Sequence, residues 1–100
     1  ESLAGLHVDL AILGCNGVDE EGRVTNLNLA EAQVKRAMLA ASASWLVAAE
    51  SAKLGARHLG TIGTLGPDAT LVTAGAWTDA AAACVASLTS LGACVVRADG

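Results

Sequence analysis

Short continuous runs of apolar residues occur four times along the chain, each bounded by residues that favour turns. Runs of this length are typical of strands that are buried on both faces. The predicted strands span residues 8–13, 45–49, 70–73 and 93–98. The segments 14–27 and 56–69 are rich in glycine and other turn residues, so we expect them to be irregular loops.

Two segments between these runs carry apolar residues at helical spacing. The first predicted helix begins after Asn28, whose side chain can cap it, and fades over residues 42–44. Glu31 lies three residues after Asn28, which is the spacing of a capping box. The second helix begins after Thr78 and is stopped by Gly92. The expected apolar stripes are Ala30, Val34, Ala37, Met38 and Ala41 in the first helix and Ala81, Cys84, Val85, Leu88 and Leu91 in the second.

The elements follow the order strand, helix, strand, strand, helix, strand. Apolar strands that alternate with helices predict an α/β fold with a parallel sheet and right-handed crossovers. Ligands of such sheets bind beyond the carboxyl ends of the strands. The loops that follow residues 8–13 and 45–49 are therefore the places to look for a site.

The composition suggests that part of the surface is covered in the intact protein. Apolar residues reach 53%, but Phe and Tyr are absent, so Ala, Val and Leu must build the interior. Charged residues are only 16% of the chain, against about a quarter in ordinary proteins. We therefore expect another domain, a lost part of the same domain or a second copy to cover the surface, and we expect a homo-oligomer.

The charge pattern excludes several functions. The net charge is −4 and no cluster of Lys and Arg occurs, so these residues are not expected to bind nucleic acid directly. No apolar run approaches the ~20 residues that cross a bilayer, and no signal peptide is present. The expectation is a cytoplasmic protein without membrane contact.

The cysteines and histidines do not indicate a metal or a bound cofactor. Cys15, Cys84 and Cys94 are odd in number and lack the spacing of a metal motif, and His7 and His58 are not spaced as a zinc pair. We expect Cys84 and Cys94 to be small apolar core residues in a reducing compartment.

Each of the two loops contains residues that could bind a ligand. The glycines between Gly14 and Gly22 let backbone amides approach a ligand, and the nearby carboxylates can accept hydrogen bonds from sugar hydroxyls. By itself, this loop is better explained as a solvated turn. Lys53 follows a strand and can meet a phosphate as a point charge, although position alone fits a solvated lysine equally well.

Other polar and aromatic residues have simpler explanations. Glu31 suits a helix start and can pair with Lys35 one turn later, and Lys35 and Arg36 suit a solvated helix face. Trp45 and Trp77 are expected to pack rather than to stack on a sugar.

Taken together, these segments form an ordered set of motifs. They are Leu13-Gly14, Gly17-Val18-Asp19, Gly22-Arg23-Val24-Thr25, Glu31-Ala32-Gln33-Val34-Lys35-Arg36-Ala37-Met38, Glu50-Ser51-Ala52-Lys53-Leu54-Gly55 and Pro67-Asp68-Ala69-Thr70-Leu71-Val72-Thr73. In this order they resemble the effector domain of DeoR-type bacterial transcriptional repressors, over nearly the whole chain. Glu50, Leu54 and Ala74 replace the Asp, Phe and Asp that are usual in the family, and these changes concern ligand specificity.

The resemblance implies a fold and a function. The fold would be that of sugar-phosphate isomerases of the ribose-5-phosphate isomerase and CoA-transferase type. The function would be to bind a phosphorylated sugar or similar metabolite and so change operator binding, without catalysis. The residues expected to bind it are Gly14, Gly17, Asp19, Glu31, Glu50 and Lys53.

The same resemblance implies that residues 1–100 are the later part of the effector domain. The winged helix-turn-helix of the family and its Gly- and Thr-rich phosphate loop have no counterpart here, so DNA would be bound only through a domain outside this sequence. The sugar, the operator and the direction of the response stay open.

Two alternatives remain. Asn16-Gly17-Val18-Asp19-Glu20 and Glu50-Ser51-Ala52-Lys53 are similar to loops of sugar-phosphate isomerases, which would make the chain an enzyme. Isomerisation needs a positioned base, however, and Asn16 cannot act as a carboxylate. The other alternative is an interaction module whose ligand site has decayed.

Overall fold

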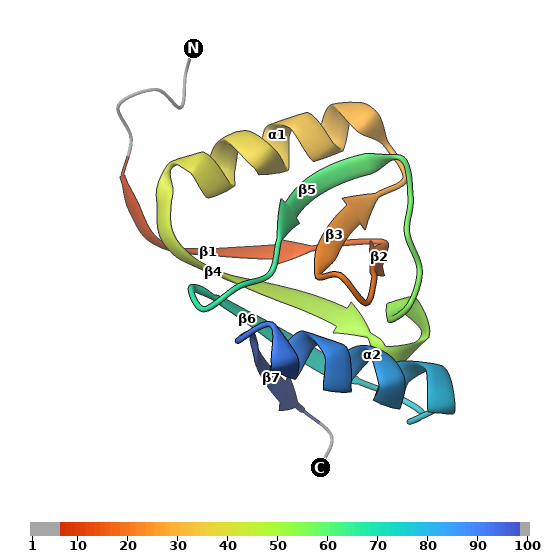
Figure 1. Cartoon of the computed structure of the whole chain (residues 1–100). Helices are drawn as coiled ribbons and strands as arrows, with labels where there is room; N and C mark the ends of the chain where they lie inside the picture. The colour runs from red at the N-terminus through yellow and green to blue at the C-terminus, as the bar shows by residue number, and fades with distance from the viewer. Residues whose placement is uncertain (1–6, 99–100) are drawn as a thin grey trace.

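The main sheet of the protein is parallel and lies at the centre of the fold (Figure 1). The computed structural model describes residues 7–98. Within them the four predicted apolar runs form β1 (Val8–Gly14), β4 (Ser42–Glu50), β6 (Ala69–Ala74) and β7 (Cys94–Arg97). They pair in the order β1-β4-β6-β7, and every pair is parallel. The prediction of a parallel α/β sheet is therefore confirmed.

A second, antiparallel sheet is formed by segments that we expected to be irregular. It contains β2 (Gly17–Val18), β3 (Arg23–Asn26) and β5 (Gly60–Thr64), in the order β2-β3-β5. The loop predictions for residues 14–27 and 56–69 were thus wrong in part. These strands are short and bounded by glycines, yet each turns a β-branched side chain into the core, including Val18, Val24 and Ile62.

Both helices begin where the sequence predicts, and the second also ends there, but the first ends at Ala40 and residues 42–44, where it was expected to fade, already belong to β4. Helix α1 (Leu29–Ala40) is capped by Asn28, whose side chain accepts a hydrogen bond from the Glu31 amide over 2.9 Å. Helix α2 (Asp79–Ser90) is capped in the same way by Thr78. Gly92 follows α2 with a φ of +89°, which favours glycine after a helix. A short 3₁₀ helix, η1 (Ser51–Lys53), follows β4.

The predicted apolar stripe was right for most of α2 and only partly right for α1, where Met38 packs against the core. Three stripe residues of α2 are buried, although Leu91 at its end is exposed. In α1 the fully buried residue is Ala32, whereas Ala30 and Val34 of the expected stripe are exposed. The reason is that α1 turns the face with Ala32 toward β5. The two elements are so close that a Cβ on Gly60 would lie only 2.7 Å from the Cβ of Ala32.

Both helices and the small sheet lie on one side of the main sheet (Figure 1). The steps from β1 to β4 and from β6 to β7 run in the same direction across the sheet, and right-handed crossovers then place their helices on the same face. This face supplies the core, which includes Leu13, Trp45, Val47 and Leu71. Trp45 packs in the core, as expected.

The opposite face of the main sheet is not covered by any described residue. We call it the bare face; it is formed by the even-numbered side chains of the four strands. Exposed apolar residues on it include Leu10, Ile12 and Val96, and Ile12 is 67% exposed. Cys94 pairs with Thr70 and faces the same way, so it is exposed and the prediction that it lies in the core was wrong.

Two findings concern the residues from 7 to 98 as a set. No helix among them is long and apolar enough to cross a membrane. They also contain no group of three or more His, Cys, Asp and Glu side chains arranged to hold a metal ion.

Candidate functional site

A hollow lies at the carboxyl end of the main sheet, where ligands of parallel sheets bind. Its volume is about 280 Å³, near the lower end of the range for small-molecule sites. Glu50 ends β4, Lys53 ends η1, and Thr73 lies near the end of β6. The residues that line the hollow are Ala48, Ala49, Glu50, Lys53, Val72, Thr73, Ala74 and Ala98.

Three residues with polar side chains contribute to the wall of this mainly apolar hollow. Lys53 is half-buried, and its ammonium group can donate hydrogen bonds to an anion. Glu50 is exposed and can accept hydrogen bonds from hydroxyl groups. Thr73 is 1% exposed, and its hydroxyl has no hydrogen-bond partner among the described residues. Thr73 is an odd-numbered residue of β6, so its side chain faces the covered side of the main sheet, whereas Val72 and Ala74 in the wall of the hollow face the other way.

A groove of about 560 Å³ lies beside this hollow, between β1 and α1. Its polar end is formed by Gly14, Glu31 and Lys35, and its body is apolar. Gly14 pairs in register with Ala48, which lines the hollow of Lys53, so the hollow and the groove border neighbouring strand ends. The structure thus brings Gly14 close to Glu31 and Glu50 close to Lys53, at adjacent places along one edge.

Glu31 and Lys35 contact the same neighbour rather than each other. The Asn26 side chain donates to Glu31 Oε2 and accepts from Lys35 Nζ, each over 3.0 Å. Lys35 Nζ also donates to the Gly14 carbonyl over 2.9 Å. The expected helical pairing of Glu31 with Lys35 is replaced by these contacts, and Lys35 is not the solvated residue that we expected.

Cys15 is buried directly after β1, near both lysines. Burial raises the pKa of its thiol, and this effect outweighs the charges of Lys53 and Lys35 and a backbone hydrogen bond from Gly17, all of which lower that pKa. The thiol therefore stays protonated at neutral pH, as expected of a packed core cysteine rather than of a nucleophile.

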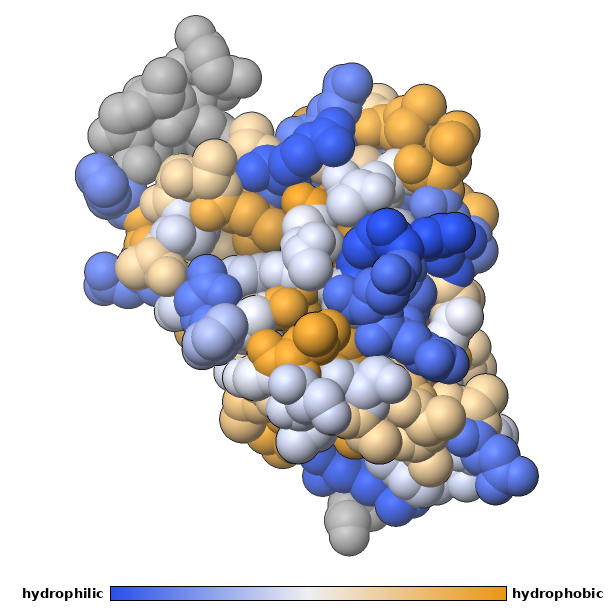
Figure 2. Space-filling view, in the orientation of Figure 1, coloured by the Kyte–Doolittle hydropathy of each residue, from blue (hydrophilic) through white to orange (hydrophobic). Residues whose placement is uncertain are grey.

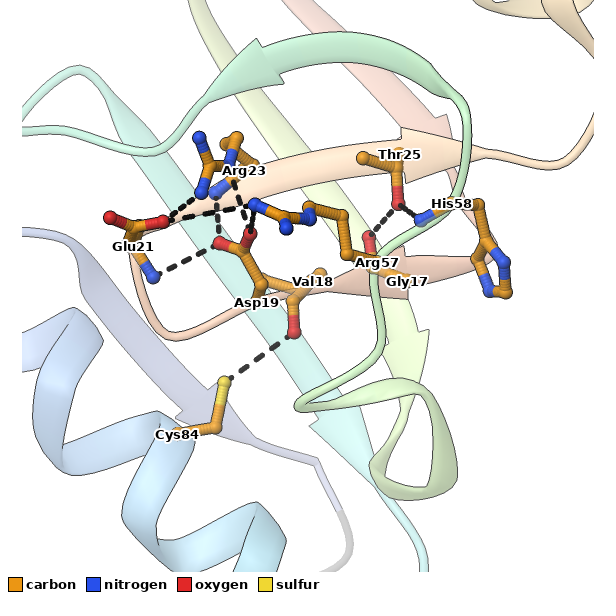
Figure 3. A network of polar contacts seen from close by, with 9 residues as sticks. All are labelled: Gly17, Val18, Asp19, Glu21, Arg23, Thr25, Arg57, His58 and Cys84. Carbon is orange, nitrogen blue, oxygen red and sulfur yellow. Dashed lines mark hydrogen bonds and ion pairs between the residues drawn. The ribbon is translucent and has the colours of Figure 1, made fainter.

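Asp19 lies away from this edge, in the turn between β2 and β3 (Figure 3). Its Oδ1 accepts hydrogen bonds from the amides of Glu21 and Arg23, and its Oδ2 accepts one from Arg23 Nε over 2.9 Å. Arg57 also lies 3.8 Å from Oδ2. Asp19 lines a separate polar hollow with Glu20, Glu21, Gly55 and Arg57, and its carboxylate is largely occupied by the turn itself.

Gly17 also serves the fold. It lies in β2, where a Cβ would come within 2.5 Å of the Ala56 carbonyl oxygen. Its own carbonyl accepts a hydrogen bond from the Thr25 hydroxyl, which in turn accepts one from the His58 amide. Gly17 and Asp19 were expected beside the ligand, but the structure places neither of them in the hollow of Lys53 or in the groove of Glu31.

Comparison with known protein families decides the relationship. Residues 1–75, three quarters of the chain, match the family described as the DeoR C-terminal sensor domain. The chain belongs to this family. Searches of curated proteins and of solved structures gave no match. The sensor domain has a sugar-phosphate-isomerase-like α/β fold, as expected from the motifs.

The match to the sensor domain contains both parts of the candidate site. It extends from β1 to β6 and includes Gly14, Glu31, Glu50 and Lys53, whereas α2 and β7 lie beyond it. Ala98, after β7, still contributes to the wall of the hollow.

Three residues in or near the candidate site were not selected from the sequence. Lys35 carries a weak signal, because it lies one helical turn after Glu31. Thr73 ends an apolar run, and ligands of parallel sheets bind near the carboxyl ends of such strands. Asn26 gives no signal at all, since its contacts depend on how β3 packs against α1.

Proposed function

We propose that this sensor domain binds a phosphorylated sugar or similar metabolite at the carboxyl end of the main sheet. Binding would change how strongly a DNA-binding domain of the same regulator holds its operator, in the bacterial cytoplasm. The observation that carries the proposal is the hollow at the carboxyl end of the main sheet, to whose wall Lys53 and Glu50 contribute. Family membership supports the regulatory context.

The chemistry of the hollow supports a phosphate at Lys53. An ammonium group binds phosphate oxygens through charge-assisted hydrogen bonds, which are stronger than those between neutral groups. The carboxylate of Glu50 would repel a second phosphate but accept hydrogen bonds from sugar hydroxyls. A metabolite with one phosphate and several hydroxyls fits this set better than a bare anion does.

Replacement of Lys53 by Ala tests the role of the ammonium group. Titration of the chain with a panel of phosphorylated pentoses and hexoses should identify at least one that binds more tightly than inorganic phosphate. Lys53→Ala should weaken that binding about tenfold or more, because hydrogen bonds to charged groups contribute about 1.5–3 kcal/mol. Isothermal titration calorimetry measures the affinities.

The matched control is Arg36→Ala, which removes one positive charge at a distance from the hollow. Arg36 donates to the Thr61 carbonyl on the far side of α1 and lines neither the hollow nor the groove. Equal losses in the two variants would indicate a general charge effect and contradict a specific contact at Lys53.

The position of Asp19 supports a sensor over an isomerase. A general base must be available to take a proton from the sugar, whereas the Asp19 carboxylate is held by two amides and Arg23. We therefore expect no ketose–aldose exchange with the sugar phosphates that bind. Turnover that disappears in Asp19→Asn would favour the enzyme instead.

The bare face supports association between copies of the chain. Exposed apolar side chains such as Leu10, Ile12 and Val96 lie on the same face of the main sheet, and large apolar patches commonly mark interfaces. We infer that two copies cover these faces against each other, because parallel sheets are otherwise covered on both sides.

A further inference from the structure

Asn26, the last residue of β3, is a buried amide between two charged side chains of α1. It is 3% exposed. Its Nδ2 donates to Glu31 Oε2 and its Oδ1 accepts from Lys35 Nζ, each over 3.0 Å. This orientation of the amide satisfies both charges, because an ammonium group only donates and a carboxylate only accepts. Each bond has one charged partner and so belongs to the stronger class of hydrogen bonds.

The two charged groups lie at the same edge of the sheet as Lys53. Lys35 donates to the carbonyl of Gly14 at the end of β1, and Gly14 pairs with Ala48 in the wall of the Lys53 hollow. Both ammonium groups also lower the pKa of the Cys15 thiol against the effect of burial, so both lie in its neighbourhood.

The contacts of Glu31 and Lys35 leave each of them able to bind more. An ammonium group has three donors, of which Lys35 uses two, for Gly14 and Asn26. A carboxylate has about four acceptor sites, and the Asn26 amide occupies one at Glu31. The remaining donor of Lys35 suits a hydroxyl or carbonyl oxygen of a sugar, and the remaining acceptors of Glu31 suit its hydroxyl groups.

We propose that Asn26 positions Glu31 and Lys35 to bind the hydroxyl-bearing part of a metabolite whose phosphate lies at Lys53. This inference rests on the proposed function and adds a second half to the same site. Asn26 is a positioning residue, because its amide is engaged by the two side chains and acts on the metabolite through them. Selectivity for a sugar phosphate over inorganic phosphate then depends on Asn26, whereas affinity for phosphate itself depends on Lys53.

The variant Asn26→Asp tests this division of roles. It keeps the shape of the side chain and an acceptor for Lys35, but it replaces the donor to Glu31 with a second carboxylate, which repels Glu31. Titration with inorganic phosphate and with the sugar phosphates of the panel gives the selectivity ratio. The preference for a sugar phosphate should fall about tenfold or more, while the affinity for inorganic phosphate stays unchanged.

Asn16→Asp is the matched control for the added charge. The Asn16 side chain only accepts, from the Leu27 amide over 2.8 Å, so an aspartate there keeps its hydrogen bond. Its selectivity ratio should equal that of the unchanged protein. If Asn26→Asp does not fold, as judged by circular dichroism, Lys35→Gln at a half-exposed position should show the same loss of preference.

The possible results separate this inference from the proposed function. If the unchanged protein prefers a sugar phosphate and the preference survives in both Asn26→Asp and Lys35→Gln, the inference alone is overturned. If the unchanged protein binds no sugar phosphate more tightly than inorganic phosphate, the proposed function fails and the inference fails with it. An equal loss of affinity for inorganic phosphate and for the sugar phosphate in Asn26→Asp would also overturn the inference, since a purely structural role of Asn26 predicts that result.

Discussion

At the scale of single residues, Gly17 is fixed by a close approach of two backbone segments. The loop after η1 passes so near β2 that a Cβ on Gly17 would lie 2.5 Å from the Ala56 carbonyl oxygen and 3.1 Å from the His58 ring. Backbone atoms cannot move aside as a flexible side chain does. Any larger residue at this position must therefore displace the loop or the strand.

Gly17→Ala should destabilise the fold by about 1–3 kcal/mol, the usual cost of overpacking a tight site. Urea unfolding followed by tryptophan fluorescence measures the change. Gly14→Ala is the matched control, because nothing lies within 4 Å of a Cβ there, and its effect should stay within about 0.5 kcal/mol. A Gly17→Ala variant as stable as Gly14→Ala would contradict the close approach.

The same scale shows why the site residues were only partly predictable. Glu50 and Lys53 follow a predicted strand directly, so their place at its carboxyl end follows from the order of elements. Asp19 carries a carboxylate, as Glu50 does, and also lies in a loop, but its oxygens accept hydrogen bonds from the turn that contains it. A sequence does not distinguish a carboxylate that accepts hydrogen bonds from its own backbone from one that is available to bind a ligand.

At the scale of elements, local signals determined the parts that were predicted correctly. The caps at Asn28 and Thr78 and the glycine after α2 act within a few residues, so the sequence is sufficient to find them. Strands β3 and β5 are four and five residues long, and they are stabilised by pairing with each other across more than thirty residues of chain. Pairing over that distance leaves no local pattern, which is why both were expected to be loops.

The cap of α2 gives a prediction at this scale. Thr78→Ala removes the hydroxyl that accepts a hydrogen bond from the Ala81 amide, and it should lower stability by about 1 kcal/mol. Thr89→Ala, near the other end of the same helix, removes an exposed hydroxyl bonded to the Val85 carbonyl and should change stability by less than about 0.5 kcal/mol. Chemical denaturation compares the two, and equal effects would argue against the cap.

At the scale of the whole molecule, the two faces of the main sheet differ in how far other elements cover them. One face of the main sheet supports two helices and a second sheet, while the other presents apolar side chains to solvent. Figure 2 shows that the covered side itself has a mixed surface, with an apolar area over the start of α1, where Leu27 and Leu29 are exposed. The low content of charged residues predicted that some apolar surface is uncovered in this chain, and the bare face is one such surface.

Association through the bare face can be tested with a charge. Ile12→Lys places an ammonium group on the bare face and should weaken self-association, because burial of an unpaired charge is costly. Leu59→Lys is the control, since Leu59 is 77% exposed but lies before β5, outside the main sheet. Sedimentation velocity over a range of concentrations reports the change. A monomer at every concentration in the unchanged protein would refute the association.

The position of β4 has a consequence for how a metabolite is bound. It is paired on both sides, with β1 and with β6, so its amides should be among the last to exchange with solvent deuterium. Glu50 and Lys53 therefore extend from one of the most persistent parts of the molecule. Because this scaffold is already ordered before a metabolite arrives, little conformational entropy is lost on binding, and weak individual contacts can still give useful affinity.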